Sequence, residues 1–148
     1  MSQPNFAEDF AAIMQVKSRY CRFLDTKDWA AYTDLFTEDF ILDTSTAGGA
    51  PPVHGREAAV TYIRSCVEHA KTAHHVHNPE MQITGDTAEV IWAMQDRVIW
   101  PEDRAVKLGE KGHTGFGQYH ERYERRDGRW RIATSRLLYL IYEPQPQD

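Results

Sequence analysis

The sequence predicts a single α+β domain, in which helices precede a meander of long antiparallel strands. Three observations support this prediction. Apolar residues recur at steps of three and four in segments before residue 72, which is typical of helices. From residue 74 onward, apolar and polar residues alternate, which is typical of strands. The 148 residues are enough for one sizeable core. Helices that cover one face of a strongly curved sheet form a cone, and its open interior is the expected ligand site.

Helices are expected in three places. The first covers residues 6–25, where the apolar positions share one face. Asp28 is the expected N-cap of a second helix over residues 29–36. A third helix is expected over residues 55–71. Between the second and third helices, residues 45–52 (STAGGAPP) have the composition of turns. We expect a flexible loop there, and the sequence leaves open whether it is a connector or a lid.

Strands account for most of the remaining chain. They are expected over residues 40–42, 74–83, 88–100, 116–125 and 130–142. Gly85-Asp86 and residues 126–129 are the expected hairpin turns. The charged segment 101–112 is predicted to be a loop. Loose termini are expected at about residues 1–7 and 143–148, so that residues 1–148 form one domain.

Composition excludes several classes of partner. The net charge is -5 and the isoelectric point is about 5.8, so there is no broad basic surface for nucleic acid or an anionic membrane. No apolar run is long enough for a membrane span. The N-terminal segment carries acidic residues and has no apolar core typical of a secretory signal, which predicts a cytoplasmic protein. Cys21 and Cys66 occupy apolar helix positions, so we expect packing thiols and no disulfide.

The candidate acid–base set consists of Tyr20, Asp25 and His74. Tyr20 lies on the inward face of the first helix, where its hydroxyl needs a polar partner. Asp25 lies at the end of that helix, where the helix dipole disfavours an acid, so another group must stabilise it. If His74 faces the interior of the cone, Asp25 can fix its tautomer and make the other ring nitrogen a general base. Tyr20 can then donate a hydrogen bond to a substrate oxygen that gains negative charge.

The histidines of the HHVH segment divide between the two faces of the expected strand. His75 and His77 share one face, which we interpret as solvated, and His74 lies on the other. A metal would need a third ligand, and Glu80 or Asp96 lies at no recognised ligand spacing. We therefore expect no metal and no cofactor.

Several other residues are candidates for the wall of the pocket. Trp92, Tyr119 and Phe40 belong either to the core or to an apolar cavity for a ring-shaped ligand. Arg136, on the last strand, is the polar candidate for substrate binding. No phosphate-binding glycine loop and no Gly-x-Ser-x-Gly element is present, since Gly115 to Gly117 open no helix.

Three segments of the chain resemble one known family. They are RYCRFLDTKDWAAYTDLFTEDF, TAHHVHNPEMQITGDTAEVIWAMQDRV and GFGQYHERYERRDGRWRIATSRL, and a Gly-Arg-Glu helix start lies between the first two. In this order they resemble the SnoaL-like branch of the NTF2-like superfamily, over about residues 8–140. The resemblance implies a cone of three helices and a bent sheet, which is usually assembled as a homodimer or homotrimer through the sheet.

Within that superfamily the chain is similar to the scytalone dehydratase and bile-acid 7α-dehydratase type. This resemblance implies that Tyr20, Asp25 and His74 are catalytic, and that Arg136 corresponds to an arginine of the bile-acid enzymes. One departure is Gly117-Gln118-Tyr119, where relatives often have Gly-His-Tyr. A second pocket histidine is therefore missing at this position, and His120 cannot replace it, because it is expected on the opposite strand face.

These observations lead to one function hypothesis with open alternatives. The first is a cofactor-free lyase, a dehydratase that acts on an apolar aromatic or polycyclic small molecule. The alternative from another class is a non-catalytic small-molecule-binding or assembly module. Among enzymes, a polyketide-cyclase-like aldol catalyst, a ketosteroid-type isomerase and an aldehyde-releasing lyase would use the same base. The isomerase has less support, because its aspartate would fall near Asp43 or Thr44 and no clear equivalent is present.

Overall fold

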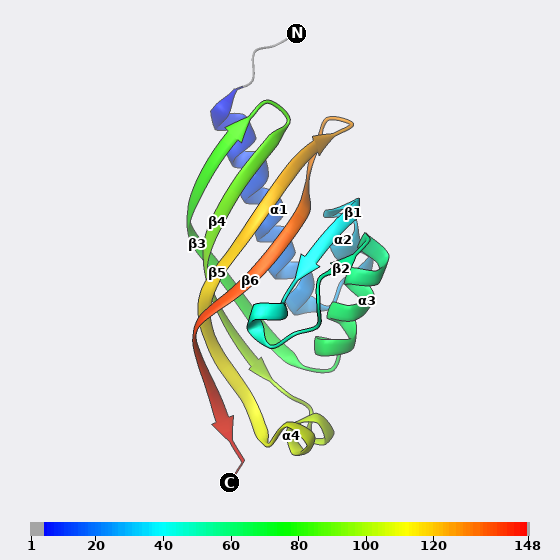
Figure 1. The fold of residues 1–148 in the computed structure, drawn as a ribbon, viewed down its shortest axis with the longest axis vertical. Helices are drawn as coiled ribbons and strands as arrows, with labels where there is room; N and C mark the ends of the chain where they lie inside the picture. The colour runs from blue at the N-terminus through cyan, green and yellow to red at the C-terminus, as the bar shows by residue number, and fades with distance from the viewer. Residues whose placement is uncertain (1–4, 148) are drawn as a thin grey trace.

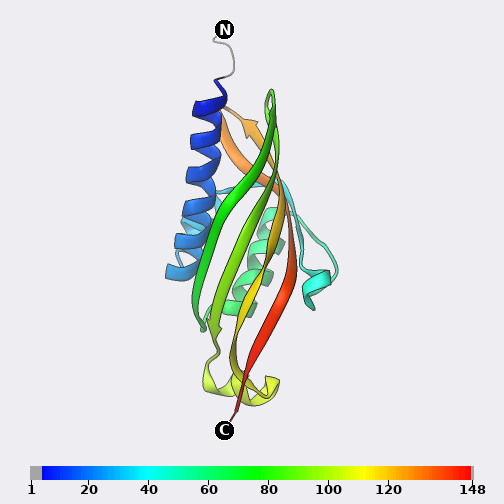
Figure 2. The same ribbon diagram turned by 90° about the vertical axis from the view of Figure 1, so that its left-hand side faces the viewer.

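A six-stranded sheet forms the centre of the structure, a computed structural model that describes residues 5–147. The strand order is β2-β1-β6-β5-β4-β3, and only the β1–β6 pair is parallel. The long strands bend together along the molecule (Figures 1 and 2). The strands are β1 (Phe36–Asp43), β2 (Val53–His54), β3 (Lys71–Thr84), β4 (Thr87–Ile99), β5 (Glu110–Arg126) and β6 (Arg129–Pro146).

In the described part of the chain, four α-helices and one 3₁₀ turn accompany the sheet. They are α1 (Phe6–Thr26), α2 (Trp29–Thr33), η1 (Ser45–Ala47), α3 (Arg56–Val67) and α4 (Glu102–Leu108). Helix α1 lies along one face of the sheet, and α4 lies at the end of the molecule near the C-terminus (Figure 1). The Asn5 side chain caps α1, and Asp28 caps α2 as predicted by accepting a hydrogen bond from Ala31 N at 3.2 Å. Across residues 5–147, no helix is both long enough and apolar enough to span a membrane.

The predicted α+β class is confirmed, and the differences occur where the chain changes element. The second helix ends at Thr33 instead of residue 36. Phe36 begins β1, because it pairs with Ile132 of β6. This pairing outweighs the helical spacing of the local sequence.

The expectation of a loop over residues 101–112 is wrong, because α4 forms there. The signals for this helix are present in the sequence. Pro101 precedes the first turn, Glu102 and Asp103 stabilise its positive end, and Gly109 ends the helix with a φ of 71°.

The tail predicted to be loose at residues 143–148 is also ordered as far as Pro146. Gln145 and Pro146 pair with Gly112 and Glu110, because β5 begins early enough to give them a partner strand. At the other end, α1 already begins at Phe6. The rest of the two termini, residues 1–4 and 148, lies outside the described residues.

The core lies between the helices and the concave side of the sheet and is rich in aromatic rings. The rings of Phe36 and Phe40 contact each other at a tilt of 32°, with centroids 4.3 Å apart, and Tyr32 packs edge-on against Phe36. Trp92 is 1% exposed and donates a hydrogen bond to the Tyr123 hydroxyl at 3.2 Å. Such ring pairs add about 0.5–1.5 kcal/mol each beyond the area that they bury.

A charged pair, Lys17 and Glu121, is fully buried at the centre of this core. Lys17 Nζ donates to Glu121 Oε1 at 2.7 Å. The carboxylate also accepts from Ser135 Oγ at 2.8 Å and from the Tyr123 hydroxyl at 2.6 Å. Both carboxylate oxygens are therefore hydrogen-bonded, which offsets the cost of taking the charge out of water.

The Lys17 ammonium also joins the core to the inward face of the first helix. Its Nζ lies 3.7 Å from the ring centroids of both Tyr20 and Tyr119. The negative faces of both rings stabilise the cation. The two rings are nearly perpendicular to each other, with an interplanar angle of 71°.

We predict that Lys17→Met alone destabilises the fold by about 3–5 kcal/mol, because it leaves Glu121 buried without its counter-charge. The double variant Lys17→Met/Glu121→Gln should recover part of this loss. Urea denaturation would measure both. The control is Arg64→Ala, which breaks an exposed pair with Glu68 and should cost less than about 1 kcal/mol. A Lys17→Met loss as small as that of Arg64→Ala would contradict the prediction.

Candidate active site

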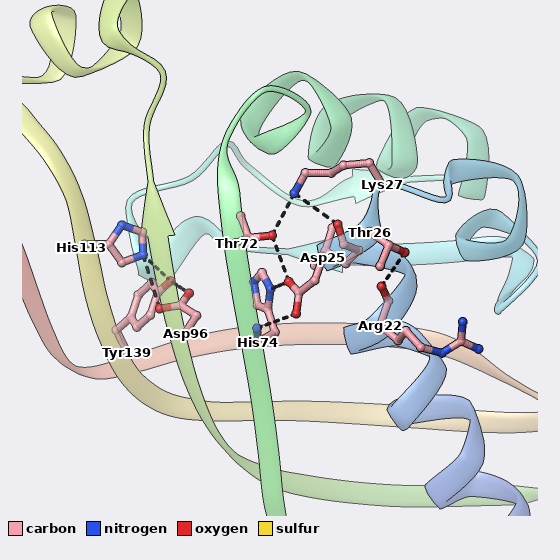
Figure 3. A network of polar contacts seen from close by, with 10 residues as sticks. Arg22, Asp25, Thr26, Lys27, Thr72, His74, Asp96, His113 and Tyr139 are labelled. Atoms are coloured by element: carbon pink, nitrogen blue, oxygen red, sulfur yellow. Dashed lines mark hydrogen bonds and ion pairs between the residues drawn. The ribbon is translucent and has the colours of Figure 1, made fainter.

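The end of α1 and the start of β3 bring Asp25 and His74 together (Figure 3). Asp25 Oδ1 lies 2.7 Å from His74 Nδ1, and Oδ2 accepts from the His74 backbone N–H at 2.8 Å. Thr72 Oγ1 donates to Oδ1 at 2.9 Å. The carboxylate is thus held at both oxygens by side-chain and backbone donors of one strand.

These contacts determine the charge of Asp25. Partial burial raises the pKa of its carboxyl, but the hydrogen bonds and charge of His74 and the bond from Thr72 outweigh burial. The net result is a pKa below the ordinary value, so Asp25 is ionised at neutral pH. Lys27 Nζ extends the network by donating to Thr72 Oγ1 at 2.8 Å. Because Asp25 engages Nδ1 of His74, the other ring nitrogen, Nε2, is the one that can meet a substrate.

A cavity of about 320 Å³ lies beside this pair. This volume falls within the range of about 300–1,000 Å³ that small-molecule sites occupy. Most of the wall is apolar, with a few polar groups among the rings and aliphatic side chains. The wall includes Tyr20, Leu24, Leu42, Tyr62, Ile63, Val67, His74, Asp96, Val98, Trp100, Arg104, Leu108, His113, Tyr119, Ser135, Leu137, Tyr139 and Tyr142.

Tyr20 lies in this wall, within a group of tyrosines. Its ring centroid is 5.2 Å from that of Tyr32 and 5.8 Å from that of Tyr119. Burial raises the pKa of Tyr20 far above its usual range, so the phenol keeps its proton and is a hydrogen-bond donor. Tyr119, expected to bind substrate, is also part of the wall.

Three other residues expected to bind substrate are not in the cavity wall. Phe40 and Trp92 are fully packed in the core, where ring and side-chain neighbours cover them. Arg136 is exposed on the outward face of β6, because Ser135 and Leu137 take the inward positions on either side of it. We therefore leave these three residues out of the candidate site.

A second polar cluster in the wall was missed by the sequence predictions. The Tyr139 hydroxyl donates to Asp96 Oδ2 at 2.5 Å, and His113 Nε2 lies 3.3 Å from Asp96 Oδ1 (Figure 3). Burial raises the Asp96 pKa, but the hydrogen bonds from His113 and Tyr139 outweigh it and leave the pKa below its ordinary value. Position 118 holds a glutamine, as the sequence shows, and His113 supplies a second pocket histidine from an earlier position on β5.

The signal for this cluster was the alternation of the strands. Asp96 follows Trp92 and Met94 on one face of β4, and it stands directly opposite His74 in the β3–β4 register. His113 was not placed on any strand, because the segment before it was predicted to be a loop. The same error hid Arg104, which α4 brings into the cavity wall with its guanidinium 4.6 Å from the Trp100 ring.

Two other expectations concern the surroundings of the site. His75 and His77 are exposed on the face opposite His74, as the strand alternation predicts. Within residues 5–147, no group of three or more histidine, cysteine or acidic side chains is arranged to hold a metal ion. Residues 45–52 border the cavity, and Thr46 ties this loop to β6 by donating to the Leu137 carbonyl at 3.1 Å.

Comparisons with known proteins agree with this fold. The model of the SnoaL-like domain family matches residues 5–136. The structure is similar to the Kfla4162 protein from Kribbella flavida, with a TM-score of 0.85 and 20% identity over 94% of this chain and 95% of that one. A scytalone dehydratase-like protein from Novosphingobium aromaticivorans gives a TM-score of 0.79 and 18% identity over 95% and 93%.

A third similar structure is LinA-type3, a hexachlorocyclohexane dehydrochlorinase from Novosphingobium barchaimii. It gives a TM-score of 0.77 and 17% identity over 93% of this chain and 90% of that one. At these identities the structural similarities establish the fold alone. Because the family model spans most of the sequence, however, this protein belongs to the SnoaL-like domain family.

Proposed function

We propose that this protein is a cofactor-independent lyase that removes water from a ring-containing small molecule. The observation that carries the proposal is that His74, which is bonded to Asp25, lies in the wall of a mostly apolar cavity. The similarity in fold to a dehydrochlorinase and a scytalone dehydratase-like protein gives it further support. Both proteins are named as elimination enzymes, and an elimination of water or hydrogen chloride requires the removal of a proton from carbon.

In this mechanism His74 is the general base. Its Nε2 takes a proton from a carbon next to a carbonyl group or a phenol ring, and Asp25 stabilises the imidazolium that results. Tyr20 donates a hydrogen bond to the oxygen that gains negative charge. The apolar wall lowers the local dielectric, so each of these polar contacts has more effect than it would in water.

The rival function is a binding module in which Asp25 and His74 only satisfy each other. His74 lies in the wall of the cavity, where its imidazole can reach a bound molecule, and this position favours chemistry over a purely structural pair. Aldol, isomerase and aldehyde-releasing reactions would use the same base. For a ketosteroid-type isomerase, Asp43 is a poor second base, because it accepts hydrogen bonds from Ser45 and lies outside the cavity wall.

His74→Ala should lower kcat/KM for elimination by about 10²–10⁴-fold, the usual contribution of a general base. A suitable probe is 4-hydroxy-4-(4-nitrophenyl)butan-2-one, whose loss of water gives an absorbing enone. The matched control is His75→Ala, which removes the neighbouring, exposed imidazole and should leave the rate unchanged. Equal activity of the wild type and His74→Ala, with both folded, would falsify the assignment of the base.

The Asp25 carboxylate also predicts how stability depends on pH. The pKa of Asp25 is lower in the folded chain than the ordinary value of 3.8. At a pH between these two pKa values, the unfolded chain therefore binds more protons than the folded chain. The contribution of Asp25 to stability is complete above about pH 4 and is lost as the pH falls through the folded pKa. In urea denaturation between about pH 6 and pH 3, Asp25→Asn should show a shallower acid decline than the wild type. Parallel declines would contradict the prediction.

We also propose that the protein is a homodimer or homotrimer that associates through the end of the sheet near α4. Large apolar side chains are exposed there on β6: Leu140 is 72% exposed and Ile141 is 52% exposed. Val106 and Leu108 of α4 are exposed at the same end (Figure 1). An apolar area of this kind is typical of an interaction surface.

Leu140→Glu/Ile141→Glu should shift the protein toward the monomer, because burying two carboxylates in an interface is costly. Light scattering after size-exclusion chromatography would measure the mass. The control is Phe6→Glu, an exposed apolar residue at the opposite end of the molecule (Figure 1). A wild-type monomer at all concentrations, or an unchanged oligomer in the double variant, would contradict this surface.

A further inference from the structure

We propose that Tyr139 is the proton donor to the leaving group, held and re-supplied with a proton by Asp96 and His113. The substrates of this site would then be β-hydroxy carbonyl compounds or their ring-fused equivalents, whose leaving group is a hydroxyl. This inference rests on the proposed function, in which His74 removes the first proton. Tyr139 would be a second acid–base group in that site, and it would favour substrates whose leaving group needs a proton.

The sheet register places this donor beside the base. His74 and Asp96 are directly opposite on β3 and β4, and such pairs hold their Cβ atoms about 4.5–5.5 Å apart. Asp96 in turn accepts the hydrogen bond from Tyr139 of β6. Base and donor therefore approach one bound molecule from neighbouring points of the same wall (Figure 3).

The backbone around Tyr139 leaves room for this arrangement. Gly115 of β5 pairs with Asp96 on β4, and the ring of Tyr139, which pairs with Gly117, lies over Gly115 from β6. A Cβ atom at Gly115 would overlap with both Asp96 Oδ1 and the Tyr139 ring. Only a residue without a side chain allows the phenol to lie across β5 and reach the carboxylate.

The cluster differs from the structural network around Glu121, in which both carboxylate oxygens are hydrogen-bonded. His113 Nδ1 is buried and lacks a hydrogen-bond partner within residues 5–147, and the contact of Asp96 Oδ1 with His113 Nε2 is long, at 3.3 Å. Incomplete hydrogen bonding of buried polar groups costs stability. Because this cluster lowers stability and lies in a cavity wall, we attribute it to ligand binding or catalysis and not to stabilisation of the fold.

His74 Nε2 takes the proton from carbon, and the C–H electron pair forms the carbon–carbon double bond while the C–O bond breaks. The Tyr139 O–H bond breaks as its proton moves to the departing oxygen, which leaves as water. The phenolate oxygen takes a proton from the His113 imidazolium, whose Nε2 lies 3.4 Å away. Solvent then removes the proton from His74 and returns one to His113.

The leaving group provides the decisive test. Hydroxide is a poor leaving group and needs a proton, whereas chloride departs without one. We therefore compare 4-hydroxy-4-(4-nitrophenyl)butan-2-one with its 4-chloro analogue, since both give the same enone. Tyr139→Phe keeps the ring that packs in the wall and removes only the proton donor.

Tyr139→Phe should lower kcat/KM for the hydroxy ketone by about 10²–10⁴-fold and leave that for the chloro ketone unchanged. Asp96→Asn and His113→Gln should show the same selectivity for the leaving group. His120→Gln is the control for His113→Gln, because His120 lies on the same strand but outside the cavity wall. It should affect neither probe.

The outcomes separate this inference from the function on which it rests. An equal loss with both probes in Tyr139→Phe, or no loss with either, overturns the role of Tyr139 while His74 keeps its own. If His74→Ala eliminates both probes at the wild-type rate, the proposed function fails. A wild type that eliminates neither probe above the buffer rate contradicts both proposals.

Discussion

The capture of the Asp25 carboxylate by β3 is the constraint on which the site depends. One oxygen accepts from the backbone of His74 and the other contacts its ring, so a single acid fixes both the strand and the imidazole. The same contact attaches the end of α1 to the edge strand of the sheet. An acid at a helix C-terminus is unfavourable by itself, and its place here follows from the donors that β3 supplies.

The structure contains two buried charged networks, one in the core around Glu121 and one in the cavity wall around Asp96. Lys17 and Glu121 are fully enclosed, and neither side chain lines the cavity. Asp96, His113 and Tyr139 border the cavity and retain unused hydrogen-bonding capacity. The two acids, Glu121 and Asp96, lie on neighbouring strands of the sheet. Tyr119 links the networks, since its ring contacts the Lys17 ammonium and also lines the cavity.

The sequence predicted the fold class because helical and strand periodicities are local properties of the chain. It also indicated that Asp25 and His74 can meet if His74 faces the interior, because a helix-end acid needs a partner and strand alternation separates His74 from His75 and His77. It did not predict the Lys17–Glu121 pair, whose members are 104 residues apart and whose contact depends on the assembled fold. The orientation of Arg136 was similarly out of reach, because a shift of one residue in a strand exchanges its two faces.

Gly115 has a consequence for how such sites diverge. Because the absence of its side chain lets Tyr139 reach Asp96, one substitution at this position would separate the two without altering any ionisable group. His74 would be retained as the base, and the contact between Tyr139 and Asp96 would be lost in a single evolutionary step. Within a family that shares one fold, a change in backbone crowding can therefore redirect chemistry as effectively as a change in a reactive side chain.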